Sequence, residues 1–74
     1  MSFDYSELRG RIKARYQTQD KFALKLGISS ASLSDKLNGK SDFSHNEIIK
    51  SCKLLEIPTK AIPLYFFTER VKET

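Results

Sequence analysis

Four serines and one alanine occupy five of the six positions from 29 to 34, and this run of small side chains is the first candidate for chemistry. Serine is a mediocre helix former, so its repetition is unexpected on a surface selected only for stability. Small side chains let a helix lie deep in a groove, serine hydroxyls donate or accept hydrogen bonds, and the methyl group of Ala31 matches that of thymine. We therefore favour insertion into a groove of DNA over the alternative, an ordinary exposed polar face.

Two charged residues follow the serines. Lys36 is placed to reach guanine, and Asp35 is placed to accept a hydrogen bond from the amine of cytosine. The positions from 29 to 37 contain no arginine, glutamine or asparagine that would read bases. The sequence therefore indicates a DNA-binding helix without revealing which operator it reads.

The segment 18–39 is predicted to form two short helices that carry these serines. Thr18 suits the cap of the first helix, and Gly27 ends it, because glycine adopts the left-handed conformation at little cost. Ala23 lies four residues before Gly27, and a small residue there lets the second helix, about 30–38, cross the first closely. This spacing defines a helix-turn-helix, whose second helix fits a major groove about 12 Å wide.

Another helix is expected before this segment, over about residues 6–16. Leu8, Ile12 and Tyr16 follow one another at intervals of four and form one apolar stripe. Gly10 lies inside this helix, where it costs up to about 1 kcal/mol relative to alanine. We therefore expect a neighbouring helix to approach closely at Gly10.

Two further helices are expected after the helix-turn-helix. Ser44 and Glu47 form a capping-box pattern, which predicts a fourth helix over about 45–55. Pro63 suits the first turn of a short fifth helix that ends near Phe66. The sequence thus predicts an all-α fold, a compact bundle of about five short helices. The residues expected to face inward from the fourth helix are Ile48, Ile49, Cys52 and Leu55.

Length and charge limit the classes of function. The 74 residues are enough for one domain, 1–74, with a thin core. Lys and Arg together number 13 and Asp and Glu number 9, which gives a net charge of +4. Residues 1–40 carry eight cations and four anions, whereas residues 41–74 carry five of each, so the whole excess lies in the first part. This asymmetry is expected of a protein that binds a polyanion, and a solvated helix surface is the equal alternative.

The pattern contains no catalytic or cofactor chemistry. Cys52 is the single cysteine, which excludes an internal disulfide and a multi-cysteine zinc site, and we expect it to be a small buried residue. Because no glycine-rich phosphate loop and no acid–base pair occurs, we expect no enzyme activity, metal, cofactor or small-molecule ligand. No apolar run approaches the roughly 18 residues of a membrane span, so we expect no membrane partner and a cytoplasmic location.

A second line of inference starts from Gln19, Ala23, Gly27, Ile28, Leu33 and the closing Asn38-Gly39-Lys40. At these spacings the residues resemble the helix-turn-helix of lambdoid phage repressor and Cro proteins, the group often called XRE-type regulators. The resemblance covers about residues 5–57. Three further segments resemble small Cro-like regulators of phages of Gram-positive bacteria: Phe3-Asp4-Tyr5, Leu37-Asn38-Gly39-Lys40 and Tyr65-Phe66-Phe67-Thr68.

The resemblance implies a five-helix domain that binds palindromic operator DNA, usually as a two-fold dimer. It assigns contacts with backbone phosphates to Gln19, at the start of the second helix, and to Asn38 and Lys40, after the third. The positions that it places on or beside the recognition helix are Ser29, Ser30, Ala31, Ser34, Asp35 and Lys36.

Basic residues outside the helix-turn-helix add candidate contacts. Arg11 and Arg15 lie four residues apart on one face of the first helix, and we expect phosphate contacts from this pair. His45 is either an ordinary exposed residue or, as the resemblance implies, a further contact with the DNA backbone. Two positions depart from the family. Many relatives carry a glutamate where Leu37 stands, and Ile12 is its expected apolar partner. The position of Lys36 is usually apolar, so its stem is expected to cover the core while its ammonium reaches a phosphate.

The C-terminal part, residues 58–74, has more aromatic surface than a small domain needs. Some of it has to pack on the other helices, and the remainder is expected to form the two-fold contact of a dimer, with plain core as the alternative. The predicted dimer contacts are Tyr65, Phe67 and Val71.

Together these features predict a sequence-specific transcriptional regulator. It would bind double-stranded operator DNA as a homodimer and occlude promoters in the manner of a phage or prophage Cro protein. Two alternatives remain open, because fold and function are separable. One is a protein-interaction module such as an antirepressor, and the other is an antitoxin-like autoregulator that binds DNA and a toxin together.

Overall fold

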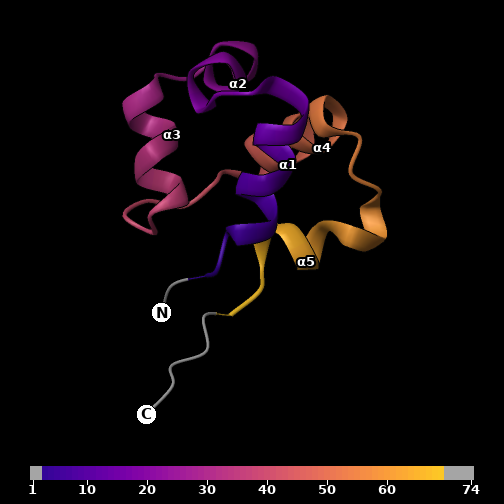
Figure 1. Cartoon of the computed structure of the whole chain (residues 1–74). Helices are drawn as coiled ribbons and strands as arrows, with labels where there is room; N and C mark the ends of the chain where they lie inside the picture. Colours follow the sequence, from indigo (N-terminus) through magenta and orange to yellow (C-terminus); the bar gives the residue numbers. More distant parts are fainter. Residues whose placement is uncertain (1–2, 70–74) are drawn as a thin grey trace.

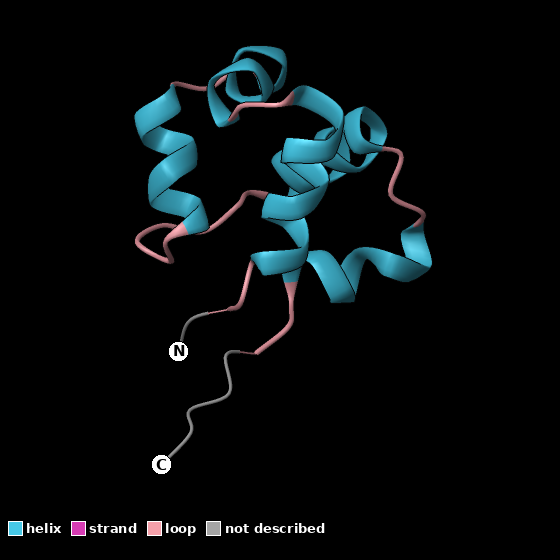
Figure 2. Cartoon of the chain, viewed as in Figure 1, coloured by secondary structure: helices cyan, strands magenta, loops and turns pink. Residues whose placement is uncertain are grey.

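The computed structural model describes residues 3–69, and the prediction of an all-α bundle is confirmed there. Short turns join the helices, which Figure 2 shows as the only regular elements of the described part. The elements are α1 (Ser6–Tyr16), α2 (Gln19–Leu26), α3 (Ser30–Leu37), α4 (His45–Leu55), a 3-10 turn η1 (Thr59–Ala61) and α5 (Ile62–Phe66).

Local side-chain chemistry fixes where the helices begin. The hydroxyls of Thr18, Ser29 and Ser44 accept hydrogen bonds from backbone N–H groups three residues later, at 3.2, 3.0 and 3.1 Å. At the start of α4 the Glu47 carboxylate also accepts from the Ser44 N–H at 2.7 Å, which completes the predicted capping box. Such caps satisfy N–H groups that have no partner within the helix, and each stabilises a helix by about 1 kcal/mol.

One hydrophobic core joins the helices. α1 packs against α2, α4 and α5, whereas α3 packs mainly against α2. As a result α3 stands at one side of the molecule, and η1 and α5 lie at the other (Figure 1). The core residues with at most 1% of their surface exposed are Leu8, Ile12, Phe22, Ala23, Leu33, Leu37, Leu55 and Phe66. Ile12 and Leu37 are both buried in this core, and their expected pairing stays a prediction.

Two expectations about packing are wrong. A Cβ atom added to Gly10 would meet nothing within 4 Å, so no neighbouring helix approaches this exposed glycine. On α4, Ile49 is 40% exposed, and the fully buried residue between the helix ends is Ser51. Ser51 and Leu55 are four residues apart and share the inward face, which turns Ile49 toward the rim of that face.

The two ends of the described chain lie side by side. The Asp4 N–H donates to the Thr68 carbonyl at 2.7 Å, and Phe3 forms an isolated β-bridge with Glu69. The ring of Phe67 meets the ring of Phe3 edge-on, with 5.6 Å between their centroids. The described ends of the chain both lie below α1 and α5 in the view of Figure 2.

Candidate functional site

A tight turn places α3 beside α2. The Gly27 and Ile28 N–H groups both donate to the Ala23 carbonyl, at 2.9 and 3.1 Å, and Gly27 has a φ of 89°. Ala23 is 1% exposed, and Leu33 of α3 is fully buried. The left-handed glycine thus allows a tight turn between α2 and α3, and the small side chain of Ala23 allows the two helices to pack closely.

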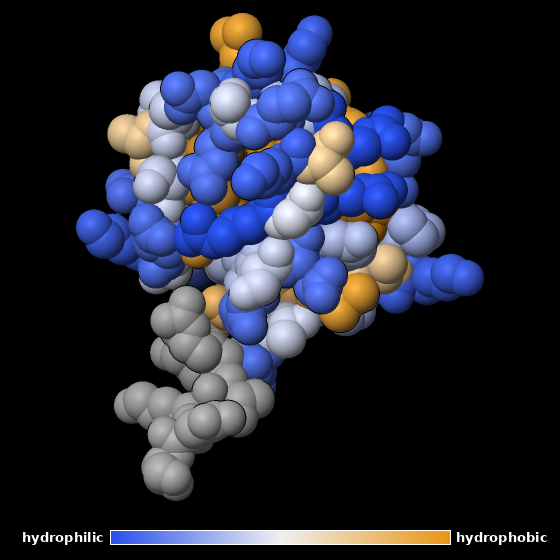
Figure 3. All heavy atoms as spheres, viewed as in Figure 1, coloured by the Kyte–Doolittle hydropathy of each residue, from blue (hydrophilic) through white to orange (hydrophobic). Residues whose placement is uncertain are grey.

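The outer face of α3 carries the predicted small residues. Ser29, Ser30, Ala31 and Asp35 are exposed, and Ser34 is half-buried beside them. The molecule's flank over α3 shows pale, weakly polar atoms among strongly hydrophilic ones (Figure 3). The structure therefore brings together five of the six residues assigned to the recognition helix, on a face that the rest of the domain does not cover.

Lys36 is the exception, because its side chain turns inward. The Lys36 ammonium lies 3.3 Å from the Glu47 carboxylate and donates to the Asp42 carbonyl at 3.1 Å, and only 12% of the side chain is exposed. Burial raises the pKa of Glu47, but hydrogen bonds from Ser44 and the contact with Lys36 outweigh it, so this pKa lies below its usual value. The Lys36 ammonium therefore links α3 to α4, and the outer face of α3 does not present it.

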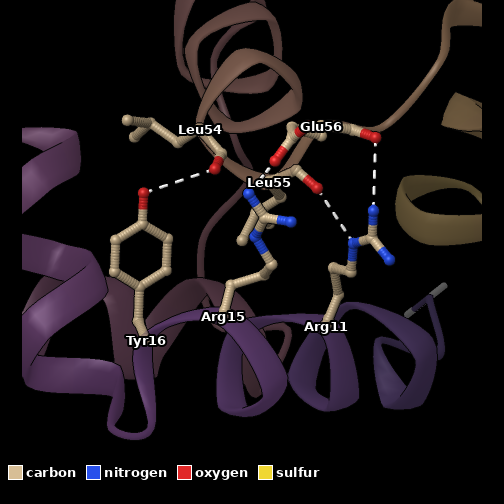
Figure 4. A network of polar contacts seen from close by, with 6 residues as sticks. All are labelled: Arg11, Arg15, Tyr16, Leu54, Leu55 and Glu56. Carbon is tan, nitrogen blue, oxygen red and sulfur yellow. Dashed lines mark hydrogen bonds and ion pairs between the residues drawn. The ribbon is translucent and has the colours of Figure 1, made fainter.

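Arg11 and Arg15 serve the end of α4. Arg11 donates to the Leu55 carbonyl at 2.9 Å and to the Glu56 carbonyl at 3.3 Å, while Arg15 forms an ion pair with the Glu56 carboxylate. Figure 4 shows both guanidinium groups reaching from α1 to the turn after α4. The positive charges complement the unpaired carbonyls at a helix C-terminus. The structure therefore does not bring the predicted pair Arg11 and Arg15 to the α3 face.

Arg9 reaches α3 instead, a contact that the sequence does not predict. Its guanidinium donates to the Leu37 carbonyl at 2.9 Å and to the Asn38 side-chain oxygen at 2.7 Å. At 100° per residue, Arg9 lies 200° around the helix from Arg11, so the two residues reach opposite neighbours. The helical offset in the sequence shows that Arg9 and Arg11 face different neighbours, but it does not show which helix lies on which side.

The remaining predicted phosphate contacts surround α3. Gln19 is half-buried at the first position of α2, while Asn38, Lys40 and His45 are exposed after α3 and at the start of α4. A hollow of about 240 Å³ lies beside Gln19. Its lining residues are Arg9, Ile12, Lys13, Gln17 and Gln19, so two cations and two carboxamides meet there.

The aromatic C-terminal segment is partly packed. Tyr65 is half-buried, and Phe67 is 48% exposed although its ring contacts Phe3. Val71 lies outside the described residues. Cys52 is half-buried, and burial raises the pKa of its thiol. Within residues 3–69, no His, Cys, Asp or Glu cluster suits a metal ion and no helix is long and apolar enough to span a membrane.

These features define a small all-helical domain whose third helix offers a narrow, weakly polar face. The chain belongs to the family described as "Protein of unknown function (DUF739)", which matches residues 1–69. A solved structure is also similar: the solution structure of the modulator of repression (MOR) of the temperate bacteriophage TP901-1 from Lactococcus lactis. The two chains are 42% identical, each is covered over 97% of its length, and the TM-score is 0.80. No curated protein matches the chain.

The relative places the chain among phage regulatory proteins of this helical fold. That part of the resemblance to phage regulators is confirmed. The family shown is DUF739, and the resemblance to the XRE-type group stays a prediction. The name of the relative describes a regulator, which agrees with the regulatory role expected for this chain. Its name refers to repression and does not say whether the ligand is DNA or a protein.

Proposed function

We propose that this chain is a phage-type transcriptional regulator that binds operator DNA with α3 in the major groove. The observation that carries the proposal is the outer face of α3, where Ser29, Ser30 and Ala31 are exposed directly after a tight turn. Small residues let a helix approach base edges closely, and their hydroxyl and methyl groups suit direct readout. Asp35 adds a single acceptor for the amine of cytosine.

The flanks of α3 support contacts with the DNA backbone. Gln19 lies in the first turn of α2, where unpaired N–H groups and the helix dipole favour an anion. Lys13 lines the hollow beside Gln19, so it replaces Arg11 and Arg15 as the proposed phosphate contact from α1. Asn38, Lys40 and His45 extend the surface past the end of α3.

A homodimer on a palindromic operator is part of the proposal. The exposed ring of Phe67, beside the half-buried Tyr65, gives a second copy an apolar surface near the end of the described chain. A two-fold interface uses the same patch on both subunits, and half-sites one helical turn apart would match it. Sedimentation with and without operator tests this part, because a strict 1:1 complex on a palindrome would exclude it.

The test of DNA binding begins with selection from random duplex oligonucleotides, followed by titration of the selected operator at several salt concentrations. A wild-type chain that binds with a steep salt dependence supports the proposal. Exchanging Ser30 and Ala31 should change the preferred sequence, since direct readout lies on this face. Gln19→Ala should weaken binding to all sequences alike, and Asn46→Ala, on the exposed side of α4, is its control.

A repressor protein as the ligand of the same face is the second candidate. Two observations favour it. The inward-turned ammonium of Lys36 leaves Asp35 as the charged residue of the α3 face, and Leu24 on α2 is 80% exposed. The name of the similar phage protein, a modulator of repression, agrees with either ligand. A chain that binds no duplex DNA at about 50 mM salt but binds a repressor tightly would establish this candidate instead.

A further inference from the structure

Core packing and polar contacts together hold the C-terminal end of α3. α3 packs mainly on α2, and its residues Leu33 and Leu37 are buried. Beyond Leu37 the chain is exposed from Asn38 to Lys40. The attachment on the α1 side is the guanidinium of Arg9, which donates to the Leu37 carbonyl and to the Asn38 side chain.

This contact fixes the orientation of the Asn38 carboxamide. A guanidinium only donates hydrogen bonds, so the carboxamide has to turn its oxygen toward Arg9. The donor–acceptor distance is 2.7 Å, short enough for a charge-assisted bond. The NH2 group of Asn38 therefore faces the other way, and its nitrogen lies 3.4 Å from the Ser34 hydroxyl oxygen.

The orientation of Asn38 also determines the role of the Ser34 hydroxyl. The Ser34 oxygen accepts from Asn38, so its own proton is available for another acceptor. The second proton of the Asn38 NH2 group has no recorded acceptor among residues 3–69. Lys40 follows with an exposed ammonium. Three neighbouring side chains thus offer donors at one end of α3, and a ligand that fits them has to present acceptors.

We propose that Arg9 is a positioning residue. It fixes the orientation of the Asn38 carboxamide, so that the Asn38 NH2 group and the Ser34 hydroxyl donate to the oxygens of a DNA phosphate. This inference rests on the proposed function, and it adds the reason why a half-buried cation beside α3 matters for binding. Both bonds that Arg9 donates to α3 come from one terminal nitrogen of its guanidinium, and the proposal gives Arg9 no contact of its own with DNA. A carboxylate of a protein partner has the same acceptor chemistry and is an outcome of the test.

The first experiment compares Arg9→Met with Lys60→Met, which removes the same charge in η1 on the other side of the molecule. Affinity for the selected operator is measured across salt concentrations. We expect Arg9→Met to bind about tenfold more weakly with the wild-type salt slope, and Lys60→Met to bind within about twofold of wild type. If Arg9→Met reduced the slope of log affinity against log salt concentration by about one, Arg9 would contact a phosphate directly, which overturns the positioning role.

Asn38→Asp gives a second measurement that does not depend on a loosened helix end. Aspartate has the same shape as asparagine, and one of its carboxylate oxygens still accepts from Arg9, so the end of α3 stays attached. The second oxygen replaces the NH2 group of Asn38, so a donor becomes an acceptor. We expect operator affinity to fall at least tenfold while thermal stability is kept. Lys60→Gln changes the net charge equally and is the control. If Asn38→Asp and Lys60→Gln lowered operator affinity equally, the proposed donors at the end of α3 would be refuted.

Nuclear magnetic resonance separates this inference from the proposed function. In the free protein, Arg9→Met should shift the side-chain amide signals of Asn38, and Lys60→Met should not. Unchanged Asn38 signals overturn the inference whether or not DNA binds. If Arg9→Met shifts them but the wild-type chain binds no DNA and binds a repressor protein instead, the proposed DNA function and the phosphate ligand fail, and the positioning of Asn38 stands.

Discussion

Lys36 and Glu47 join the end of α3 to the first turn of α4. Their charged groups are 3.3 Å apart, and the same Glu47 carboxylate accepts from the Ser44 N–H in the capping box. A residue that the sequence suggested for DNA therefore determines how α3 is held relative to α4. Arg9 contacts α3 from the α1 side, so two cations hold α3 from two directions.

This pair makes stability depend on pH in a defined direction. Because the pKa of Glu47 lies below its ordinary value of 4.5, the folded state binds this proton less tightly than the unfolded state. Its contribution is complete above pH 4.5 and is lost as the pH falls through the lowered folded value. Glu47→Gln keeps an oxygen for the Ser44 N–H, so it should lower stability by about 0.5–1 kcal/mol at neutral pH. Urea unfolding between pH 3 and 7 measures it, and an unchanged acid limb in the variant would contradict this assignment.

Arg11 and Arg15 should differ in their effect on stability. Arg11→Met removes two bonds to carbonyls at the end of α4 and should cost about 1–2 kcal/mol. Arg15→Met removes an ion pair whose side chains are 41% and 64% exposed, and solvent screening limits its effect to less than about 0.5 kcal/mol. Urea unfolding measures both. Neither variant should alter the salt slope of DNA binding, and a reduced slope would restore their predicted role as phosphate contacts.

Local chemistry was readable from the sequence, whereas long-range partners were not. The caps at Thr18, Ser29 and Ser44 depend on residues three positions away, so their pattern alone predicts the helix starts. The reach of Arg9 and Lys36 depends on which helix lies beside each of them, and periodicity does not supply that information. A flexible cation looks the same in a sequence whether it binds a phosphate or a helix end.

The same limit explains α4 and provides another prediction. Ser51 is fully buried, and its hydroxyl has no hydrogen-bond partner among residues 3–69, although hydropathy would place a larger apolar residue at such a position. Ser51→Ala removes an unsatisfied polar group, so it should raise the free energy of unfolding by about 1 kcal/mol. Ser41→Ala, at an exposed position, is the control and should change little. Destabilisation by Ser51→Ala in urea would show that the hydroxyl has an acceptor in solution.

Two glycines should respond in opposite directions to alanine. Gly10 lies inside α1 with open space around it, so Gly10→Ala should stabilise the domain by about 0.5–1 kcal/mol. Gly27 has a φ of 89°, where a Cβ is strained, so Gly27→Ala should cost about 1–2 kcal/mol. The nearest atom to that Cβ would be the Lys50 ammonium at 3.6 Å, an ordinary contact, which leaves backbone strain as the cause. Thermal unfolding of both variants measures the pair, and a loss of stability in Gly10→Ala would mean that another surface packs against α1 in solution.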